Sequence, residues 1–294
     1  MNSFTIKDLE TLSGIKAHTI RIWEQRYALL KPQRTDTNIR YYSNDELKNL
    51  LNIALLNKYG YKISHITNMT PQQVKEKILL LSNNEAQLER LITELIQYMV
   101  DMDMDLFESV LSKYIAIKGI ERCITQVIFP FLNKIGILWQ TDNINPTQEH
   151  LVTNIIRQKI IVGIENVVPF QGSSKTVLLF MPEGEYHELG LLYVHYVLKS
   201  RGIKTVYLGA NVPVRDLPSI IAIKKPDYIY THITSLNMST GFEKFLNHSN
   251  QFLSNQKLVV SGYQAQNYAK AVPANITFKK TMQQVLEFVA SLSA

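Results

Sequence analysis

From residue 173 onward the sequence alternates short apolar runs with helical segments, and this alternation constrains the fold more than any other feature. The apolar runs are rich in β-branched and aromatic residues and are bounded by turn residues, as strands are. Strands that alternate with helices are joined by crossover connections, so the pattern predicts a doubly wound α/β domain with a parallel sheet. The five predicted strands are 177–180, 205–208, 228–231, 257–260 and 276–278.

A histidine follows the first of these strands, at the position where such sheets bind ligands. The strand is stopped by Pro182 and Gly184, and the loop then reads Glu185-Tyr186-His187-Glu188-Leu189-Gly190 before the next helix begins. Open α/β sheets bind ligands outside the carboxyl ends of their strands. His187 is therefore a candidate ligand-binding residue, although its spacing alone fits an ordinary polar loop residue equally well.

The N-terminal part has the pattern of a winged helix-turn-helix. Two short helices, expected at about 4–14 and 16–27, are separated by a turn that contains Gly14. The segment 31–42 places turn residues between two short extended pieces, which predicts a β-hairpin wing. In such modules the second helix and the wing contact DNA. Candidate DNA-binding residues are His18, Thr19, Arg21, Arg26, Arg34, Arg40 and Tyr41.

The charge of this N-terminal part supports the same interpretation. Residues 1–42 contain seven lysines and arginines and four acidic residues, so they carry +3 of the formal net charge of +6. A module that contacts the phosphates of double-stranded DNA needs such a local excess of positive charge. The alternative is a solvated basic surface, which the alternation of Arg and Tyr in the wing makes the weaker reading.

Residues 3–70 closely resemble the MerR family of transcription regulators. The Ile-Arg-x-Trp-Glu-x-Arg-Tyr form at 20–27 is similar to the branch of that family that contains the light-responsive regulators CarH and LitR. The resemblance implies winged-helix DNA binding in the major groove. Asn38 stands where the family usually has Gly in the wing turn, and Asn tolerates positive φ better than most residues. The matching motifs are Thr5-Ile6-Lys7-Asp8-Leu9, Ser13-Gly14, Thr19 to Tyr27, Pro32-x-Arg34-Thr35 and Arg40-x-Tyr42-Ser43.

The middle of the chain is helical almost throughout, which predicts a small helical bundle. Together these patterns predict three domains, at 1–75, 76–168 and 173–294. Cys123 is the only cysteine, which excludes a disulfide framework and a site made of several thiolates. No apolar stretch reaches the roughly 18–20 residues of a membrane span, and no signal segment is evident at the N-terminus, so we expect a cytoplasmic protein.

An aromatic residue and a polar pair stand out within the bundle. Trp139 is at the expected end of one helix, and Glu149 and His150 are at the expected start of the next. By spacing alone, Trp139 reads more readily as a core residue and Glu149 as an acidic residue near a helix N-terminus. The three residues resemble the Trp-x₉-Glu-His signature of cobalamin-binding photoreceptor regulators. That resemblance implies that they cover one face of the cofactor.

The last domain resembles the Rossmann-like cobalamin-binding domain. The motifs of that domain appear as Glu185-x-His187-x-x-Gly190, Thr234-Ser235-Leu236 and Ser261-Gly262. The resemblance implies that His187 is the lower axial ligand of cobalt, held by the preceding carboxylate. Thr234, Leu236, Ser261 and Gly262 would then line the path of the nucleotide tail. Glu185 replaces the usual Asp, and Ser261 replaces the first Gly of a Gly-Gly pair.

These patterns predict a regulator and not an enzyme. The expected function is a repressor whose oligomeric state, dimer or tetramer, and whose DNA binding are controlled by a corrinoid, most readily adenosylcobalamin with light sensing. Gln140 stands where light-responsive members commonly have a second histidine, so the cofactor's presence is an alternative signal. A further alternative is a domain that binds no cobalamin and answers a protein partner or assembles constitutively. A corrinoid methyl carrier or mutase subunit is the weakest reading, because it has no use for a winged helix.

Overall fold

The chain is described here from a computed structural model that covers residues 3–139, 146–168, 170, 172–236 and 241–293. Its residues group into two compact units, Met1–Ile156 and Arg157–Ala294. The domain boundaries near residues 75 and 170 stay predictions. Within the described ranges, no helix has both the length and the apolar character needed to cross a membrane.

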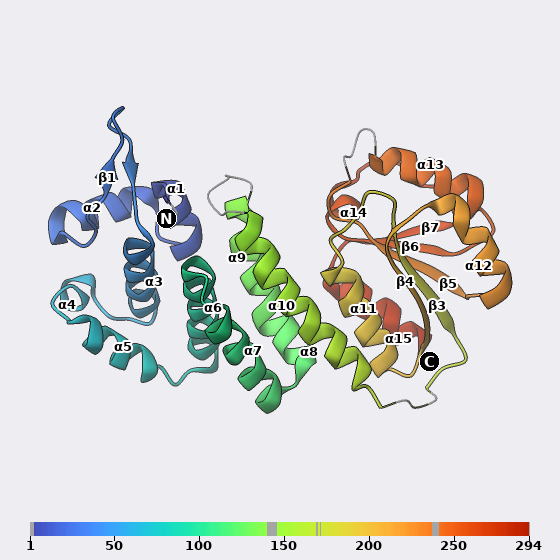
Figure 1. The fold of residues 1–294 in the computed structure, drawn as a ribbon, viewed down its shortest axis with the longest axis horizontal. Helices are drawn as coiled ribbons and strands as arrows, with labels where there is room; N and C mark the ends of the chain where they lie inside the picture. Colours follow the sequence, from blue (N-terminus) through green and yellow to red (C-terminus); the bar gives the residue numbers. More distant parts are fainter. Residues whose placement is uncertain (1–2, 140–145, 169, 171, 237–240, 294) are drawn as a thin grey trace. The chain divides into compact units, whose positions relative to one another are not determined.

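The first two helices form the expected helix-turn-helix (Figure 1). Helix α1 (Ile6–Ser13) begins with a capping box, in which Thr5 Oγ1 accepts from the Asp8 amide at 3.3 Å and the Asp8 carboxylate accepts from the Thr5 amide at 2.6 Å. It ends at Gly14, whose φ of 73° is the left-handed conformation that glycine adopts without strain. Helix α2 (Ala17–Tyr27) follows and buries Ile20 and Trp23.

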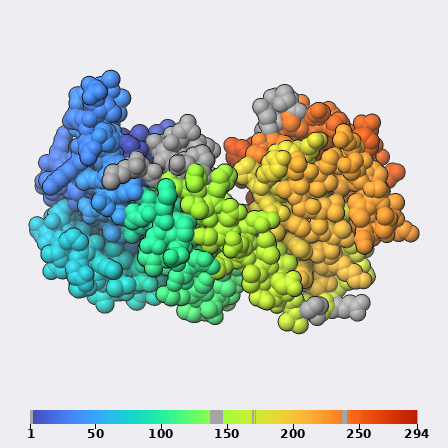
Figure 2. Space-filling model, in the orientation of Figure 1, coloured from blue at the N-terminus to red at the C-terminus, as the bar shows by residue number. Residues whose placement is uncertain are grey.

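The wing is a short antiparallel hairpin, as the sequence predicted. Strand β1 (Gln33–Arg34) pairs with β2 (Arg40–Tyr41). The turn residue Asn38 has a φ of 65°, so it adopts the left-handed conformation that a glycine would otherwise supply. Figure 2 shows this hairpin, in blue, projecting from the surface of the N-terminal unit.

The remainder of the N-terminal unit is helical. Ser43 caps α3 (Asn44–Lys58), whose apolar face, with Leu47 and Leu50, is fully buried. Phe107 and Phe131 pack edge to face, with ring centroids 5.5 Å apart, at the centre of the following helices. The largely helical pattern predicted for the middle of the chain is present in the described residues. The helices after α3 are α4 (Ile63–Ile66), α5 (Pro71–Leu79), α6 (Asn84–Asp101), α7 (Met104–Lys118), α8 (Ile120–Cys123), the π-helix η1 (Ile124–Ile128), α9 (Phe129–Trp139) and α10 (Pro146–Glu165).

The second unit contains a five-stranded parallel sheet with the order β4-β3-β5-β6-β7. All five strands predicted from the sequence are present, and the doubly wound fold is confirmed. Because β3 lies between β4 and β5, the loops that leave β3 and β5 meet at the switch point where such sheets bind ligands. The strands are β3 (Thr176–Pro182), β4 (Lys204–Val212), β5 (Tyr228–His232), β6 (Leu258–Ser261) and β7 (Ile276–Lys279).

Helices cover both faces of this sheet. Figure 1 shows α11 and α15 together on one face, and α12 and α13 on the other. Strand β3 is buried almost throughout, as expected for a central parallel strand with two covered faces. The helical segments are α11 (Leu189–Ser200), the 3₁₀ turn η2 (Val214–Asp216), α12 (Leu217–Lys224), α13 (Glu243–Phe252), α14 (Tyr263–Asn267) and α15 (Met282–Leu292).

Candidate functional site

Glu185 lies at the switch point of the sheet and its side chain is completely buried. Its Oε1 atom accepts from the backbone amides of Tyr186 and His187, each at 3.0 Å, and from the Ser235 hydroxyl at 3.0 Å. Its Oε2 atom accepts from the amides of Thr234 and Ser235, each at 2.7 Å. One carboxylate therefore joins the loop after β3 to the loop after β5.

The same carboxylate orients His187. The imidazole Nδ1 lies 2.8 Å from Glu185 Oε1, and the side chain is 56% exposed. Burial alone raises the pKa of Glu185, but the hydrogen bonds from His187, Ser235 and Thr234 outweigh it and lower that pKa to about 2. An ionised carboxylate only accepts hydrogen bonds, so the proton of the neutral imidazole lies on Nδ1. The Nε2 lone pair is then the one suited to a metal ion.

The two predicted glycines lie where the backbone approaches other groups closely. A Cβ atom at Gly190 would lie 2.4 Å from Nε2 of the His232 ring. Gly262 has a φ of 95°, and a Cβ there would lie 2.4 Å from the Ile233 carbonyl oxygen. Neither position can take a side chain without displacing its surroundings.

The hydroxyl of Ser261 belongs to a buried polar group. Tyr230 donates its hydroxyl hydrogen to Ser261 Oγ at 2.6 Å, and Nδ1 of His232 lies 2.9 Å from the same oxygen. Burial lowers the pKa of His232 to about 4, so this imidazole is neutral at pH 7. The extra side chain at Ser261 is thus held by neighbours from the end of β5. His232 and Tyr230 are not among the residues predicted from the sequence, although the position of His232 at a strand end is a signal that could have indicated it.

A second acidic residue of the loop, Glu188, makes contacts that the sequence did not suggest. Its Oε1 accepts from the Tyr207 hydroxyl at 2.6 Å, and its Oε2 accepts from Arg157 Nε at 2.8 Å. The His195 ring stacks on Tyr207 with centroids 4.7 Å apart. These contacts fix the start of α11, directly after His187, to strand β4 and to the C-terminal half of α10.

The structure describes only some of the residues that were predicted to cover one face of the cofactor. Trp139 is the last residue of α9, and Gln140 lies outside the described residues. Glu149 and His150 lie in the first turns of α10, with His150 Nδ1 3.4 Å from Glu149 Oε2. The imidazole is largely exposed. The joint action of these residues with His187 stays a prediction.

The candidate DNA-binding residues lie on α2 and the wing, and none belongs to the core. His18, Arg21, Arg26 and Arg34 are exposed, while Thr19, Arg40 and Tyr41 are half-buried. Arg34 and Tyr41 make hydrogen bonds within the hairpin, to Asn38 Oδ1 at 2.5 Å and to Gln33 Oε1 at 2.6 Å.

Glu24 connects the second helix to the wing, and sequence reasoning missed it. Its Oε1 accepts from Arg40 Nε at 3.2 Å, and its Oε2 accepts from the hydroxyl of the buried Tyr42 at 3.1 Å. Burial, and then the nearby Glu24 charge, raise the pKa of Tyr42. Arg40 is therefore oriented by a nearly buried carboxylate of α2, a contact between residues that are far apart in the sequence.

Comparisons with known proteins match the helix-turn-helix and the helical region after it, and they find relatives over most of the chain. Residues 4–73 match the family model of the MerR HTH family regulatory proteins, and residues 91–162 match that of the B12 binding domain. The chain is 26% identical to the HTH-type transcriptional repressor CarH of Myxococcus xanthus, over 85% of each protein. It is 24% identical to the repressor CarA of the same organism, over 91% of this chain and 89% of CarA.

One solved structure shares the fold. The monomethylamine corrinoid protein of Methanosarcina barkeri superposes with a TM-score of 0.56 at 13% identity, covering 69% of this chain and 98% of that protein. The chain therefore joins a MerR helix-turn-helix domain to a B12 binding domain, and it is homologous to CarH and CarA over most of its length. These two relatives are transcription regulators and not enzymes, which removes the methyl-carrier and mutase readings.

Proposed function

We propose that this protein is a cytoplasmic DNA-binding repressor whose assembly and DNA binding are controlled by a corrinoid held through His187. The observation that carries the proposal is the imidazole held through Nδ1 by Glu185 at the switch point of the sheet, so that Nε2 would be the nitrogen that binds the metal. A histidine whose second nitrogen is held by a buried carboxylate is the arrangement that metal-binding histidines use.

The residues around His187 fit a corrinoid with adenosylcobalamin as the first choice. The donor set offers one axial imidazole, and Gly190 and Gly262 keep the backbone close to its neighbours where no side chain fits. Thr234, Leu236, Ser261 and Gly262 would contact the tail, while Trp139, Glu149 and His150 would cover the upper face. When bound, adenosylcobalamin supplies a light-sensitive cobalt–carbon bond.

Control of DNA binding requires only that the cofactor bind one assembly state more tightly than another. A homo-oligomer, dimer or tetramer, brings several winged helices to one operator, so assembly raises the affinity for DNA. In this arrangement domain 1–75 would bind DNA. Domain 76–168 would cover the cofactor, and domain 173–294 would hold it through His187.

The test of this proposal is gel filtration of the chain reconstituted with adenosylcobalamin, in the dark and after green illumination. We expect a larger assembly in the dark than after illumination, and tighter DNA binding by the larger form. Equal elution volumes with the cofactor retained would mean that the protein senses the presence of a corrinoid and not light, as Gln140 suggests.

A second candidate is a regulator whose last domain binds no cobalamin and answers a protein partner or assembles constitutively. The observation in its favour is that the His232 ring already lies against Gly190 and Ser261, in the region assigned to the tail. Failure of the purified chain to retain any cobalt absorbance after desalting would support this candidate.

The wing is expected to contribute to DNA affinity through phosphate contacts. Arg34→Ala and Arg40→Ala should each reduce the slope of log affinity against log salt concentration by about 1, because each variant loses one phosphate contact. Arg40→Ala should have the larger effect on affinity, because it also breaks the contact with Glu24. Fluorescence anisotropy with a labelled duplex at several salt concentrations measures both quantities.

The matched control is Lys58→Ala, which removes a positive charge from the far end of α3, where it pairs with Glu89. That variant should keep the native salt slope. A slope that is equally reduced in all three variants would indicate a general loss of charge and would contradict specific contacts by the wing.

A further inference from the structure

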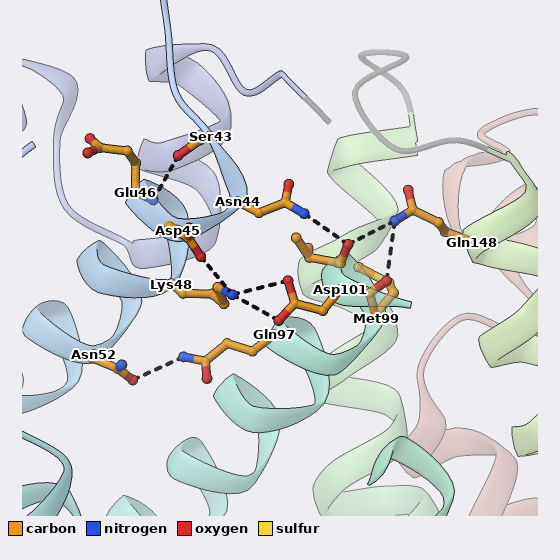
Figure 3. A network of polar contacts seen from close by, with 11 residues as sticks. Ser43, Asn44, Asp45, Glu46, Lys48, Asn52, Gln97, Met99, Asp101 and Gln148 are labelled. Atoms are coloured by element: carbon orange, nitrogen blue, oxygen red, sulfur yellow. Dashed lines mark hydrogen bonds and ion pairs between the residues drawn. The ribbon is translucent and has the colours of Figure 1, made fainter. Parts of the chain in front are cut away.

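The end of helix α6 is held by side chains from two other helices. The last carbonyls of a helix have no partners within the helix. Here Asn44 Nδ2, from the first turn of α3, donates to the Val100 carbonyl at 3.2 Å. Gln148 Nε2, from the start of α10, lies 3.3 Å from the same oxygen and 3.3 Å from the Met99 carbonyl (Figure 3). A carbonyl oxygen has two lone pairs, so it can accept both amides at once.

Two more contacts fix α3 along α6. Lys48 Nζ donates to both carboxylate oxygens of Asp101, at 3.1 and 2.9 Å, and Gln97 donates to Asn52 Oδ1 at 3.0 Å (Figure 3). The DNA-binding module is thus attached to α6 by a row of polar contacts. Within this row, the Val100 carbonyl is the group that also accepts a hydrogen bond from α10, through Gln148.

The first turn of α3 is continuous with the wing. Strand β2 ends at Tyr41, Tyr42 pairs with Phe4 through backbone hydrogen bonds of 3.0 and 2.8 Å, and Ser43 caps α3. Asn44 is the next residue. The Oδ1 atom of Asn44 is buried without a hydrogen-bond partner among the described residues, so its bond to Val100 is the polar contact that holds this side chain.

Gln148 is placed to connect this junction to the start of α10. Its side chain is fully buried, and Glu149 and His150 follow it directly in the sequence. A buried amide that loses its acceptors costs about 1–3 kcal/mol, so the side chain keeps these contacts as long as the first turn of α10 stays in place. A shift of that turn by about 1 Å would stretch hydrogen bonds that are already long.

We propose that Gln148 and Asn44 are positioning residues for DNA binding, coupled through the carbonyl of Val100. The position of the first turn of α10 determines the position of the end of α6. The end of α6 in turn determines the position of the first turn of α3 and of the wing that precedes it. A role for Glu149 and His150 in passing a cofactor signal to these hydrogen bonds rests on the proposed function. The coupling of Gln148 and Asn44 through Val100 does not depend on it.

The test is a double-mutant cycle read by amide hydrogen exchange in the full-length chain without cofactor. Gln148→Met keeps the length of the side chain and removes its donors, and Gln148→Leu repeats the loss with another uncharged side chain of similar volume if the methionine variant does not fold. We expect exchange in the segment 43–48 to become about fivefold faster in Gln148→Met, as for the loss of one net hydrogen bond. In the double variant Gln148→Met/Asn44→Ala, the acceleration of exchange should be smaller than the product of the two single accelerations.

The matched control is Asn52→Ala, which removes another hydrogen bond between α3 and α6 without touching Val100. In the double variant Asn52→Ala/Gln148→Met, the acceleration of exchange should equal the product of the two single accelerations. Independent effects of Asn44→Ala and Gln148→Met would overturn the proposal, and so would a uniform acceleration that includes α7.

A second arm adds adenosylcobalamin and separates this proposal from the proposed function. Cofactor should change exchange at 43–48 in the native chain but not in Gln148→Met, while the absorbance titration shows that both bind it. An unchanged response in a cofactor-loaded Gln148→Met chain would overturn the signalling role. The absence of any spectral change in the native chain would reject the proposed function and leave the cofactor-free cycle as the test of the junction.

Discussion

Replacing His187 with alanine is expected to weaken corrinoid binding by roughly 100-fold or more. Partners that merely orient a metal ligand are worth about 10–100-fold in metal affinity, and here the ligand itself is removed. The imidazole lies on the surface side of Glu185 and is 56% exposed, so its loss should leave the fold intact. Absorbance of the cobalt chromophore after desalting, and titration at several cofactor concentrations, measure the effect.

The matched control for this prediction is His248→Ala in the same unit. His248 is also an exposed histidine, but it lies on α13, where its ring packs edge to face on Phe252, and not beside Glu185. That variant should retain the cofactor. Equal retention by His187→Ala and the native chain would reject cobalt coordination by His187.

Replacing Glu185 with alanine is expected to destabilise the protein by about 3 kcal/mol or more, because hydrogen bonds to a charged group contribute about 1.5–3 kcal/mol each and several are lost. The change would leave the backbone amides of Thr234 and Ser235 without their carboxylate acceptor. Corrinoid binding should be lost as well, because His187 would no longer be oriented. Urea unfolding followed by circular dichroism measures the free energy of unfolding.

Glu185 also makes a specific prediction for acid stability. Its pKa is about 2 in the folded chain and 4.5 for the group in its usual state, so folding favours the ionised form. The resulting stabilisation, about 3 kcal/mol, is complete above pH 4.5 and is lost as the pH falls towards 2. Glu185→Gln should remove this part of the pH dependence. Parallel stability curves for the native chain and Glu185→Gln between these pH values would contradict the prediction.

Local patterns in the sequence were sufficient to predict the fold. The apolar run of β3 and the turn at Gly14 each depend on neighbouring residues, and each has the predicted structure. The Glu185–His187 contact could also be predicted, because a resemblance specified both residues and they are two positions apart.

Contacts between distant residues could not be predicted in this way. Glu24 and Arg40 are brought together by the packing of the wing against α2, and Val100 and Gln148 by the packing of α10 against α6. Glu24 and Gln148 are residue types that are ordinary for an exposed helix surface, and nothing in their local sequence indicates a partner. The contact of His232 with Ser261 depends on strand order, which the alternation of strands and helices does not specify.

The carboxylate of Glu185 has a consequence for the kinetics of cofactor uptake. It already holds His187, Thr234 and Ser235 in the chain without cofactor, so the ordering entropy of these residues is lost on folding and not on binding. A preorganised site needs no slow rearrangement of its lower half before the ligand enters. The step that involves His187 should therefore proceed at a rate that rises linearly with corrinoid concentration.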